Sequence, residues 1–77
     1  MLIKFDKSVK FRLIDEYGLS CFEEKEDCLM MNFSYDNKDY AFSWVMGFGD
    51  KAEVLEPKEA HLEFKRIIEN NLKKYKK

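Results

Sequence analysis

The scarcity of chain-breaking residues constrains the fold of this sequence more than any other feature. Three glycines and one proline occur in 77 residues, so they mark the few places where a regular element has to stop. Gly18 and Gly49 each follow a run with the apolar spacing of a helix, and Pro57 opens a third such run. The sequence therefore divides into three helical segments, separated by stretches that alternate in hydrophobicity.

The first stretch and the first helix occupy residues 1 to 18. Residues 2–6 have the period-two pattern of a strand, with Ile3 and Phe5 on one face. Asp6 is placed to cap a helix, and apolar residues then recur every four positions up to Gly18. We therefore expect a strand followed directly by a helix.

Residues 20–35 are predicted to form a β-hairpin, because two strand-like runs flank the charged turn at 24–27. Alternation assigns four residues of the second run to the core, namely Leu29, Met31, Phe33 and Tyr35. Cys28 and Met30 then point to the opposite face. Cys21 and Cys28 flank the turn, but no second pair of cysteines or histidines completes a zinc site. We expect two reduced, structural thiols, with no metal and no cofactor.

The second half of the chain has two further helices with a strand between them. Asp36 is placed to cap the second helix, which ends before Gly49. Its apolar stripe comprises Tyr40, Ala41, Trp44, Val45 and Phe48. Residues 52–56 form a short strand, and Pro57 starts a long final helix. One face of that helix carries Ala60, Phe64, Ile67, Ile68, Leu72 and Tyr75.

This order of elements, βαββαβ followed by a long helix, predicts a single α+β domain. Two right-handed crossovers onto an antiparallel sheet would give a ferredoxin-like sandwich with both helices on one face. The other face would expose Leu55, Cys28 and Met30 unless the final helix or a second copy of the domain covers it. We therefore expect a homodimer, and the candidate contact residues are Leu55, Phe64, Ile68 and Leu72.

Charge and composition argue against several classes of function. Fourteen basic and fifteen acidic side chains leave a net charge of −1, which gives no general attraction to nucleic acid or to anionic membranes. No apolar run approaches the roughly 18 residues that span a bilayer. We expect a globular, cytoplasmic domain with no membrane segment.

Enzymatic activity has little support in the sequence. Acylphosphatases share this element order, but they need a glycine-rich, arginine-bearing loop after the first strand, and here only Arg12 follows it. We expect Arg12 to be solvated and His61 to be a surface residue, because neither has a catalytic partner at a convincing spacing. We therefore predict that the protein is not an enzyme.

RNA-binding domains with the same element order stack bases on aromatic residues of the sheet. Phe5, Phe33 and Tyr35 are aromatic strand residues, but they fall on the face assigned to the core. The third strand also lacks the basic and glycine-containing start of the usual signature. RNA binding is the less favoured alternative.

Residues 41–75 resemble the C-terminal extension, called the WCX domain, of WYL-domain transcriptional regulators with a DeoR-like helix-turn-helix. The resemblance rests on Trp44 before Gly49, on the sequence VLEP at 54–57, and on the closing amphipathic helix that ends at Tyr75. The sequence LIKFDKSVKFRLIDE near the N-terminus is similar to the first strand and helix of the same domain. Trp44 and Gly49 are expected to have an architectural role.

The resemblance implies a regulatory and oligomerisation module that relays or stabilises a DNA-binding state. It also implies that residues 1–77 are the C-terminal piece of a longer transcriptional regulator, in which other domains contact DNA. Family members commonly carry an arginine where this chain has His61, so an anion contact at that position does not carry over. The alternative function is an effector sensor, in which a small molecule binds a cleft lined by Met30, Trp44 and Phe48.

Overall fold

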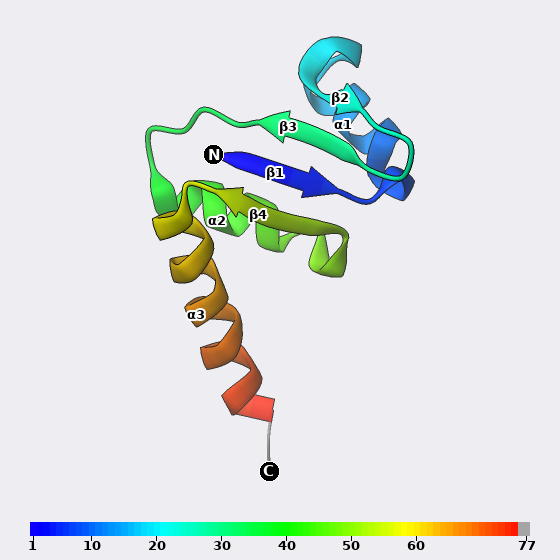
Figure 1. Ribbon diagram of the computed structural model, residues 1–77. Coiled ribbons are helices and arrows are strands. Elements are labelled where there is room, and N and C mark those ends of the chain that lie inside the picture. Colours follow the sequence, from blue (N-terminus) through cyan, green and yellow to red (C-terminus); the bar gives the residue numbers. More distant parts are fainter. Residues whose placement is uncertain (76–77) are drawn as a thin grey trace.

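The computed structural model, which describes residues 1–75, contains one four-stranded antiparallel sheet (Figure 1). Its strands are β1 (Leu2–Phe5), β2 (Glu23–Glu24), β3 (Leu29–Asn32) and β4 (Ala52–Glu56), in the order β2-β3-β1-β4. In the centre of the sheet, Ile3 of β1 lies opposite Met31 of β3 and Val54 of β4. This register brings the apolar side chains of three strands onto one face.

Two of the three α-helices cover that face. They are α1 (Lys10–Tyr17) and α2 (Lys38–Met46), and the third helix is α3 (Lys58–Tyr75). Leu13 of α1 and Val45 of α2 are fully buried in the same core as Ile3 and Phe5 of β1. Single turns of 3₁₀ helix precede α1, β2 and β4, namely η1 (Lys7–Val9), η2 (Leu19–Cys21) and η3 (Gly49–Lys51). The predicted α+β class, with a long C-terminal helix, is confirmed.

One of the two N-cap residues predicted from the sequence is confirmed, and the other is displaced by one residue. The Asp6 carboxylate accepts a hydrogen bond of 2.8 Å from the Ser8 amide, and this bond lowers the pKa of Asp6. Helix α2 is capped by Asn37, whose side chain accepts from the Tyr40 amide at 3.0 Å. The prediction that Asp36 is the cap was therefore wrong by one residue.

The apolar stripe of α2 also differs from the prediction. Phe42 is buried, whereas Tyr40 is 62% exposed and does not belong to the core. Phe42 is buried because α2 has a second contact surface, which faces α3. There the Phe42 ring packs on Phe64, with ring centroids 5.3 Å apart. A helix packed between a sheet and another helix has a wider buried face than one stripe of four-residue spacing indicates.

The second face of the sheet is less apolar than the sequence suggested. Lys4 lies at its centre, opposite Met30 on one side and Glu53 on the other. Met30 and Leu55 are half-buried, and Cys28 is buried rather than displayed. Helix α3 packs along β4 and extends past the sheet (Figure 1).

Cys21 and Cys28 are both free thiols.

Removing the Phe33 ring tests the assignment of that side chain to the core. We expect Phe33→Ala to lower the free energy of unfolding by about 3–5 kcal/mol in urea denaturation, because the buried ring stacks on Trp44. The matched control is Phe11→Ala, since Phe11 is 75% exposed and its loss should change stability by less than about 0.5 kcal/mol. A Phe33→Ala protein as stable as wild type that had lost binding to RNA would contradict the core assignment.

Substitutions at Gly49 test the turn that follows α2. Gly49 has φ of 63°, and a Cβ atom built on it would meet nothing within 4 Å. Any loss of stability on substitution therefore comes from the left-handed backbone conformation alone. We expect Gly49→Ala to destabilise the fold by about 1–2 kcal/mol. Gly49→Asn should cost less and Gly49→Val more, because asparagine tolerates this conformation and β-branched residues do not. Equal melting temperatures for the three variants would contradict this explanation.

Candidate interaction surface

The first half of α3 is fixed to the rest of the domain. Ala60 and Phe64 are buried, and Phe64 packs on α2. The Nδ1 atom of His61 lies 2.7 Å from the carbonyl oxygen of Val54. Because a carbonyl oxygen can only accept, Nδ1 carries the proton and donates this bond. His61 is therefore a half-buried contact between α3 and β4, and not the surface residue that was expected.

An ion pair adds a second connection between α2 and α3. The Nζ atom of Lys38 lies 2.8 Å from a carboxylate oxygen of Glu63. The hydrogen bond to Glu63 raises the pKa of Lys38. Both side chains are partly exposed, so we expect the pair to orient the two helices more than to stabilise them.

Beyond Phe64, the apolar face of α3 becomes increasingly exposed within residues 1–75. Ile68 is 46% exposed, Leu72 is 52% exposed and Tyr75 is 85% exposed. Their spacing of four and three residues places them on the side of the helix that carries Phe64. Figure 1 shows this half of α3 extending beyond the sheet. We call Ile68, Leu72 and Tyr75 the projecting face of α3.

A hollow of about 200 Å³ lies where α3 meets the edge of the sheet, and we call it the β4 hollow. Its lining residues are Ala52, Glu53, Val54, His61, Phe64, Lys65, Ile68 and Glu69. The apolar residues of the lining come from both β4 and α3, and three charged residues share it. Ile68 belongs both to this lining and to the projecting face of α3, so the hollow and the face form one continuous surface.

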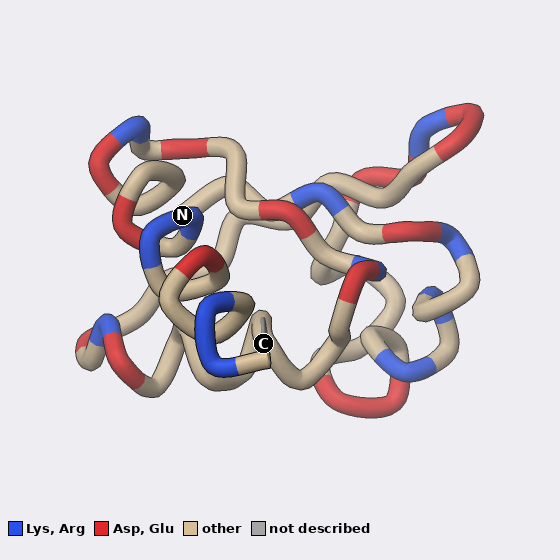
Figure 2. Tube along the Cα trace, turned by 90° about the horizontal axis from the view of Figure 1, so that it is seen from below, with Lys and Arg blue, Asp and Glu red and all other residues tan. Residues whose placement is uncertain are grey.

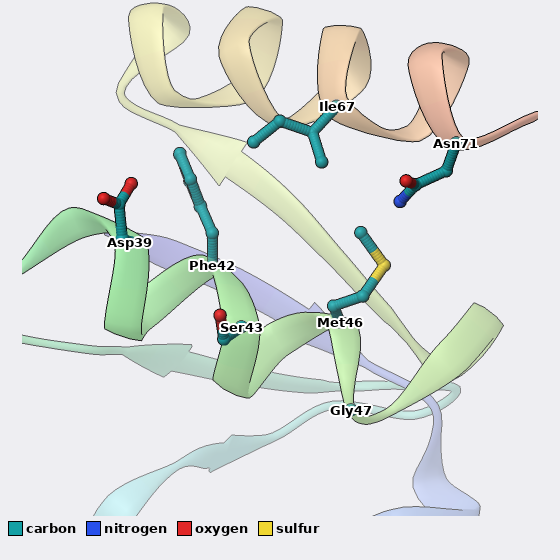
Figure 3. Close-up of a pocket in the computed structure, with 7 residues that line it drawn as sticks. All are labelled: Asp39, Phe42, Ser43, Met46, Gly47, Ile67 and Asn71. Carbon is teal, nitrogen blue, oxygen red and sulfur yellow. The ribbon is translucent and has the colours of Figure 1, made fainter.

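A larger groove of about 620 Å³ lies on the other side of α3, between it and α2 (Figure 3). We call it the α2–α3 groove, and it is lined by Asp39, Phe42, Ser43, Met46, Gly47, Ile67 and Asn71. Phe42, Met46 and Ile67 give it an apolar surface. The polar members of the lining come from both helices.

Trp44 lies in an aromatic cluster between α1 and α2. Its ring stacks on Phe33, with centroids 4.6 Å apart and planes 9° from parallel. Three further rings meet it edge-on, those of Phe5, Tyr17 and Phe48. Such aromatic contacts add to the area that the rings bury. The structure therefore gives Trp44 a packing role.

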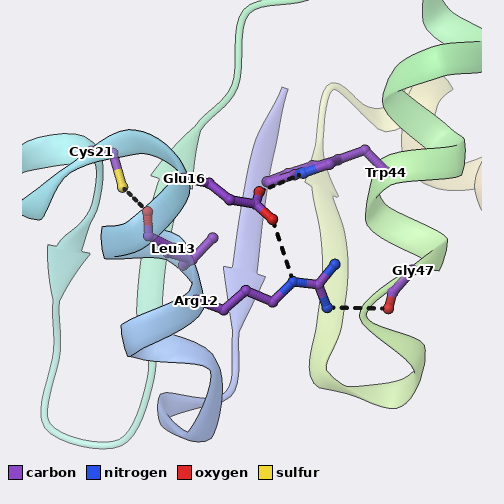
Figure 4. Close-up of polar contacts among 6 residues, drawn as sticks. All are labelled: Arg12, Leu13, Glu16, Cys21, Trp44 and Gly47. Atoms are coloured by element: carbon purple, nitrogen blue, oxygen red, sulfur yellow. Dashed lines mark hydrogen bonds and ion pairs between the residues drawn. The ribbon is translucent and has the colours of Figure 1, made fainter.

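Polar contacts close the exposed side of this cluster (Figure 4). The indole Nε1 of Trp44 donates to Glu16 at 3.1 Å, and Glu16 pairs with Nε of Arg12 at 3.6 Å. The guanidinium group of Arg12 lies 3.9 Å from the ring centroid of Phe48 and donates to the carbonyl oxygen of Gly47 at 3.3 Å. Arg12 is exposed, as expected, and it also joins α1 to the end of α2.

The structure does not bring the three residues of the expected effector cleft together. Trp44 and Phe48 pack in the core, while Met30 points to the opposite face of the sheet. A cleft lined by these three residues is therefore absent from the described part of the chain. The signal that would have located the α2–α3 groove is Ile67, which continues the apolar face of α3 on its α2 side.

The residues expected at an interface separate into two groups. Phe64 and Ile68 line the β4 hollow, and Leu72 lies one turn beyond Ile68 on α3. Leu55 is half-buried and does not line this hollow. Only the α3 members of the set thus form one surface.

Two further kinds of site were searched for in the described residues, a metal centre and a membrane-spanning helix. Within residues 1–75, no three His, Cys, Asp or Glu side chains are grouped so that they could hold a metal ion. No helix in this range is long and apolar enough to cross a membrane. In the view of Figure 2, basic and acidic residues are interspersed along the described chain.

Comparison with known families agrees with this architecture. The family model described as the WCX domain matches residues 2–71. No curated protein and no solved structure matches the chain. Because the family match covers nearly all of the 77 residues, the chain belongs to the WCX domain family.

Proposed function

We propose that this WCX domain is a non-enzymatic regulatory and oligomerisation module of a WYL-type transcriptional regulator, in which it relays or stabilises the DNA-binding state. Family membership carries the proposal, because WCX domains are found in WYL-type regulators. The chain would then be the C-terminal piece of a longer protein, and DNA would be contacted by other domains of that protein.

The surface of the domain supports a role in contacts between proteins. Ile68, Leu72 and Tyr75 expose apolar side chains on one helix, which is typical of an interaction surface. Basic and acidic residues are interspersed along the described chain in the view of Figure 2, which gives no support to the binding of phosphate groups. Two paired copies would hold two helix-turn-helix domains at the fixed spacing that a palindromic operator requires.

We also propose that the fold is a ferredoxin-like sandwich with one added helix. The proposal is supported by the alternation of elements and by the sheet order, in which β1 and β3 are central and β2 and β4 are the edges. Both α1 and α2 contribute to one core on one face of the sheet. In such a sandwich, α3 is the added element, and it carries the proposed contact surface.

The RNA-binding alternative loses support from the burial of two of its three candidate residues. Phe5 and Phe33 are buried beneath α1 and α2, so their rings are not available to stack on bases. On the opposite face of the sheet, Lys4, Glu53 and the half-buried Met30 provide no aromatic platform.

A repression assay tests the proposed function. The 77 residues would be fused behind a helix-turn-helix domain that represses a palindromic operator only when dimerised. We expect the fusion to repress the reporter at least about tenfold more than the DNA-binding domain alone, because paired modules raise the effective concentration of the second half-site contact. Repression no stronger than that of the DNA-binding domain alone, at equal levels of folded protein, would contradict the proposal.

A second candidate function is the sensing of a small effector, and the α2–α3 groove favours it. Its volume of about 620 Å³ falls in the range of small-molecule sites. Asp39, Ser43 and Asn71 supply polar groups beside the apolar surface of Phe42 and Ile67. Because the groove is bounded by α3, a ligand in it would act on the orientation of the helix that carries the contact surface.

Thermal denaturation with a panel of metabolites tests the sensor hypothesis. A ligand at 100 times its Kd stabilises the fold by about 2.7 kcal/mol. For a domain of this size, this corresponds to a rise in Tm of about 10–20 °C. Ser43→Phe should narrow the groove and abolish the rise. Tyr40→Phe, at an exposed position outside the groove lining, should retain it. A rise that persists in Ser43→Phe would exclude this groove as the site.

A further inference from the structure

Asp39 is the one ionised side chain among the described residues that line the α2–α3 groove, and no lysine or arginine accompanies it in the lining. Apolar side chains of both helices lie next to it. We propose that the groove binds a small amphipathic amine, whose ammonium group pairs with Asp39 and whose apolar body lies on Met46 and Ile67. This inference rests on the sensor function, the second candidate above, and names the chemical class of the effector.

Helix α2 presents a polar row and an apolar row to the groove. Asp39, Ser43 and Gly47 follow one another at intervals of four residues, which places them along one side of the helix. Phe42 and Met46 form a parallel row with the same interval. Since a helix rises about 1.5 Å per residue, the polar row is about 12 Å long. An elongated ligand with one polar end fits this arrangement.

The apolar part of the groove is where the body of such a ligand would be held. Met46 and Ile67 pack against the core but remain partly exposed. Figure 3 shows Met46 directed toward α3, and Ile67 and Asn71 directed toward α2. A ligand between the helices would withdraw these apolar groups from water. The flexible thioether side chain of Met46 can adapt to the shape of the ligand.

The charges around Asp39 leave its end of the groove negative. Lys38 precedes Asp39, but its Nζ atom lies 2.8 Å from a carboxylate oxygen of Glu63, so these two charges offset each other. The ion pairs among the described residues do not include Asp39. An ammonium group could therefore pair with Asp39 without displacing a lysine of the described chain.

The same lining disfavours anions. A phosphate or carboxylate group would meet no cationic partner in the groove and would be repelled by Asp39. A neutral ligand could use the apolar surface but would gain nothing from the carboxylate. Because Asp39 is exposed, water and salt screen the ion pair. We therefore expect a preference of about three- to tenfold for an ammonium over a hydroxyl group on the same apolar body.

A second hollow with carboxylates is less suited to this ligand. It has a volume of about 250 Å³, and its lining includes Asp6, Asp27 and Asp50 together with Lys4 and Lys51. The Nζ atom of Lys51 lies 3.8 Å from a carboxylate oxygen of Asp50. The lysines of this hollow compete with an incoming ammonium group for the carboxylates. This second hollow therefore serves as an internal reference for unspecific binding of cations.

A titration followed by nuclear magnetic resonance tests the proposed ligand class. The 77-residue chain would be titrated with hexylamine, hexanol and hexanoate, which share one alkyl chain and differ in the charge of the head group. For ligands of this size we expect Kd values of roughly millimolar. Hexylamine should bind most tightly and hexanoate most weakly, with shift changes at the methyl groups of Met46 and Ile67. The preference for hexylamine over hexanol should decrease at high ionic strength.

Substitutions at Asp39 test the ion pair. Asp39→Asn should lower the affinity for hexylamine to that for hexanol and leave the affinity for hexanol unchanged within about twofold. Asp39→Glu, which keeps the charge, should retain the preference. The matched control is Asp36→Asn, at an exposed position outside the groove lining, and it should also retain the preference. Thermal denaturation checks folding, because a carboxylate in the first turn of α2 also favours the helix dipole.

The possible outcomes separate the ligand class from the sensor function. Equal binding of hexylamine and hexanol in the groove, unchanged by Asp39→Asn, would overturn the ammonium site and leave the groove as a site for neutral ligands. Shift changes with hexylamine that occur only at the second hollow, or none at all, would also overturn it. The sensor function would then still stand if a metabolite of another class raised the Tm and Ser43→Phe abolished that rise. It would fall if no metabolite of the panel did so.

Discussion

The aromatic cluster around Trp44 is the contact on which the other packing in this domain depends. It joins four parts of the chain, because Phe5 comes from β1, Tyr17 from α1, Phe33 from the end of β3 and Trp44 from α2. A chain of this length has room for only one core, and Phe5 and Phe33 of this cluster belong to it. Their packing fixes α2 against the sheet, and the position of α2 decides where Phe42 can meet α3.

The same chain of contacts explains why α3 has two different halves. Its first turns are held by Phe64, by the hydrogen bond from His61 to β4 and by the ion pair of Glu63 with Lys38. Beyond them, the apolar side chains of α3 become more exposed, from Ile68 through Leu72 to Tyr75. Ile67 faces the α2–α3 groove and Ile68 lines the β4 hollow. A ligand on one side of α3 would therefore act on the same helix that carries the proposed contact surface on the other side.

Local sequence patterns predicted the elements but not the contacts between helices. Alternation placed Ile3 and Phe5 in the core, and the backbone demand for φ above zero was located at Gly49. Phe42 was missed because its burial depends on α3, which is distant in sequence. The contacts of Arg12 were missed for a similar reason, since its partners Phe48 and Gly47 lie at the far end of α2. The expected cleft of Met30, Trp44 and Phe48 failed because alternation along β3 turns Met30 away from both aromatic residues.

The proposed oligomerisation function requires the domain to associate with a second copy of itself, and the projecting face of α3 is the candidate surface. The most direct measurement is a concentration series of backbone amide chemical shifts by nuclear magnetic resonance. If copies associate through α3, the concentration-dependent chemical shifts should cluster at residues 61–75 of α3 and at β4. The chemical shifts of α1 and β2 should stay constant. Changes confined to the sheet face around Lys4 and Met30, or shifts independent of concentration up to the millimolar range, would contradict it.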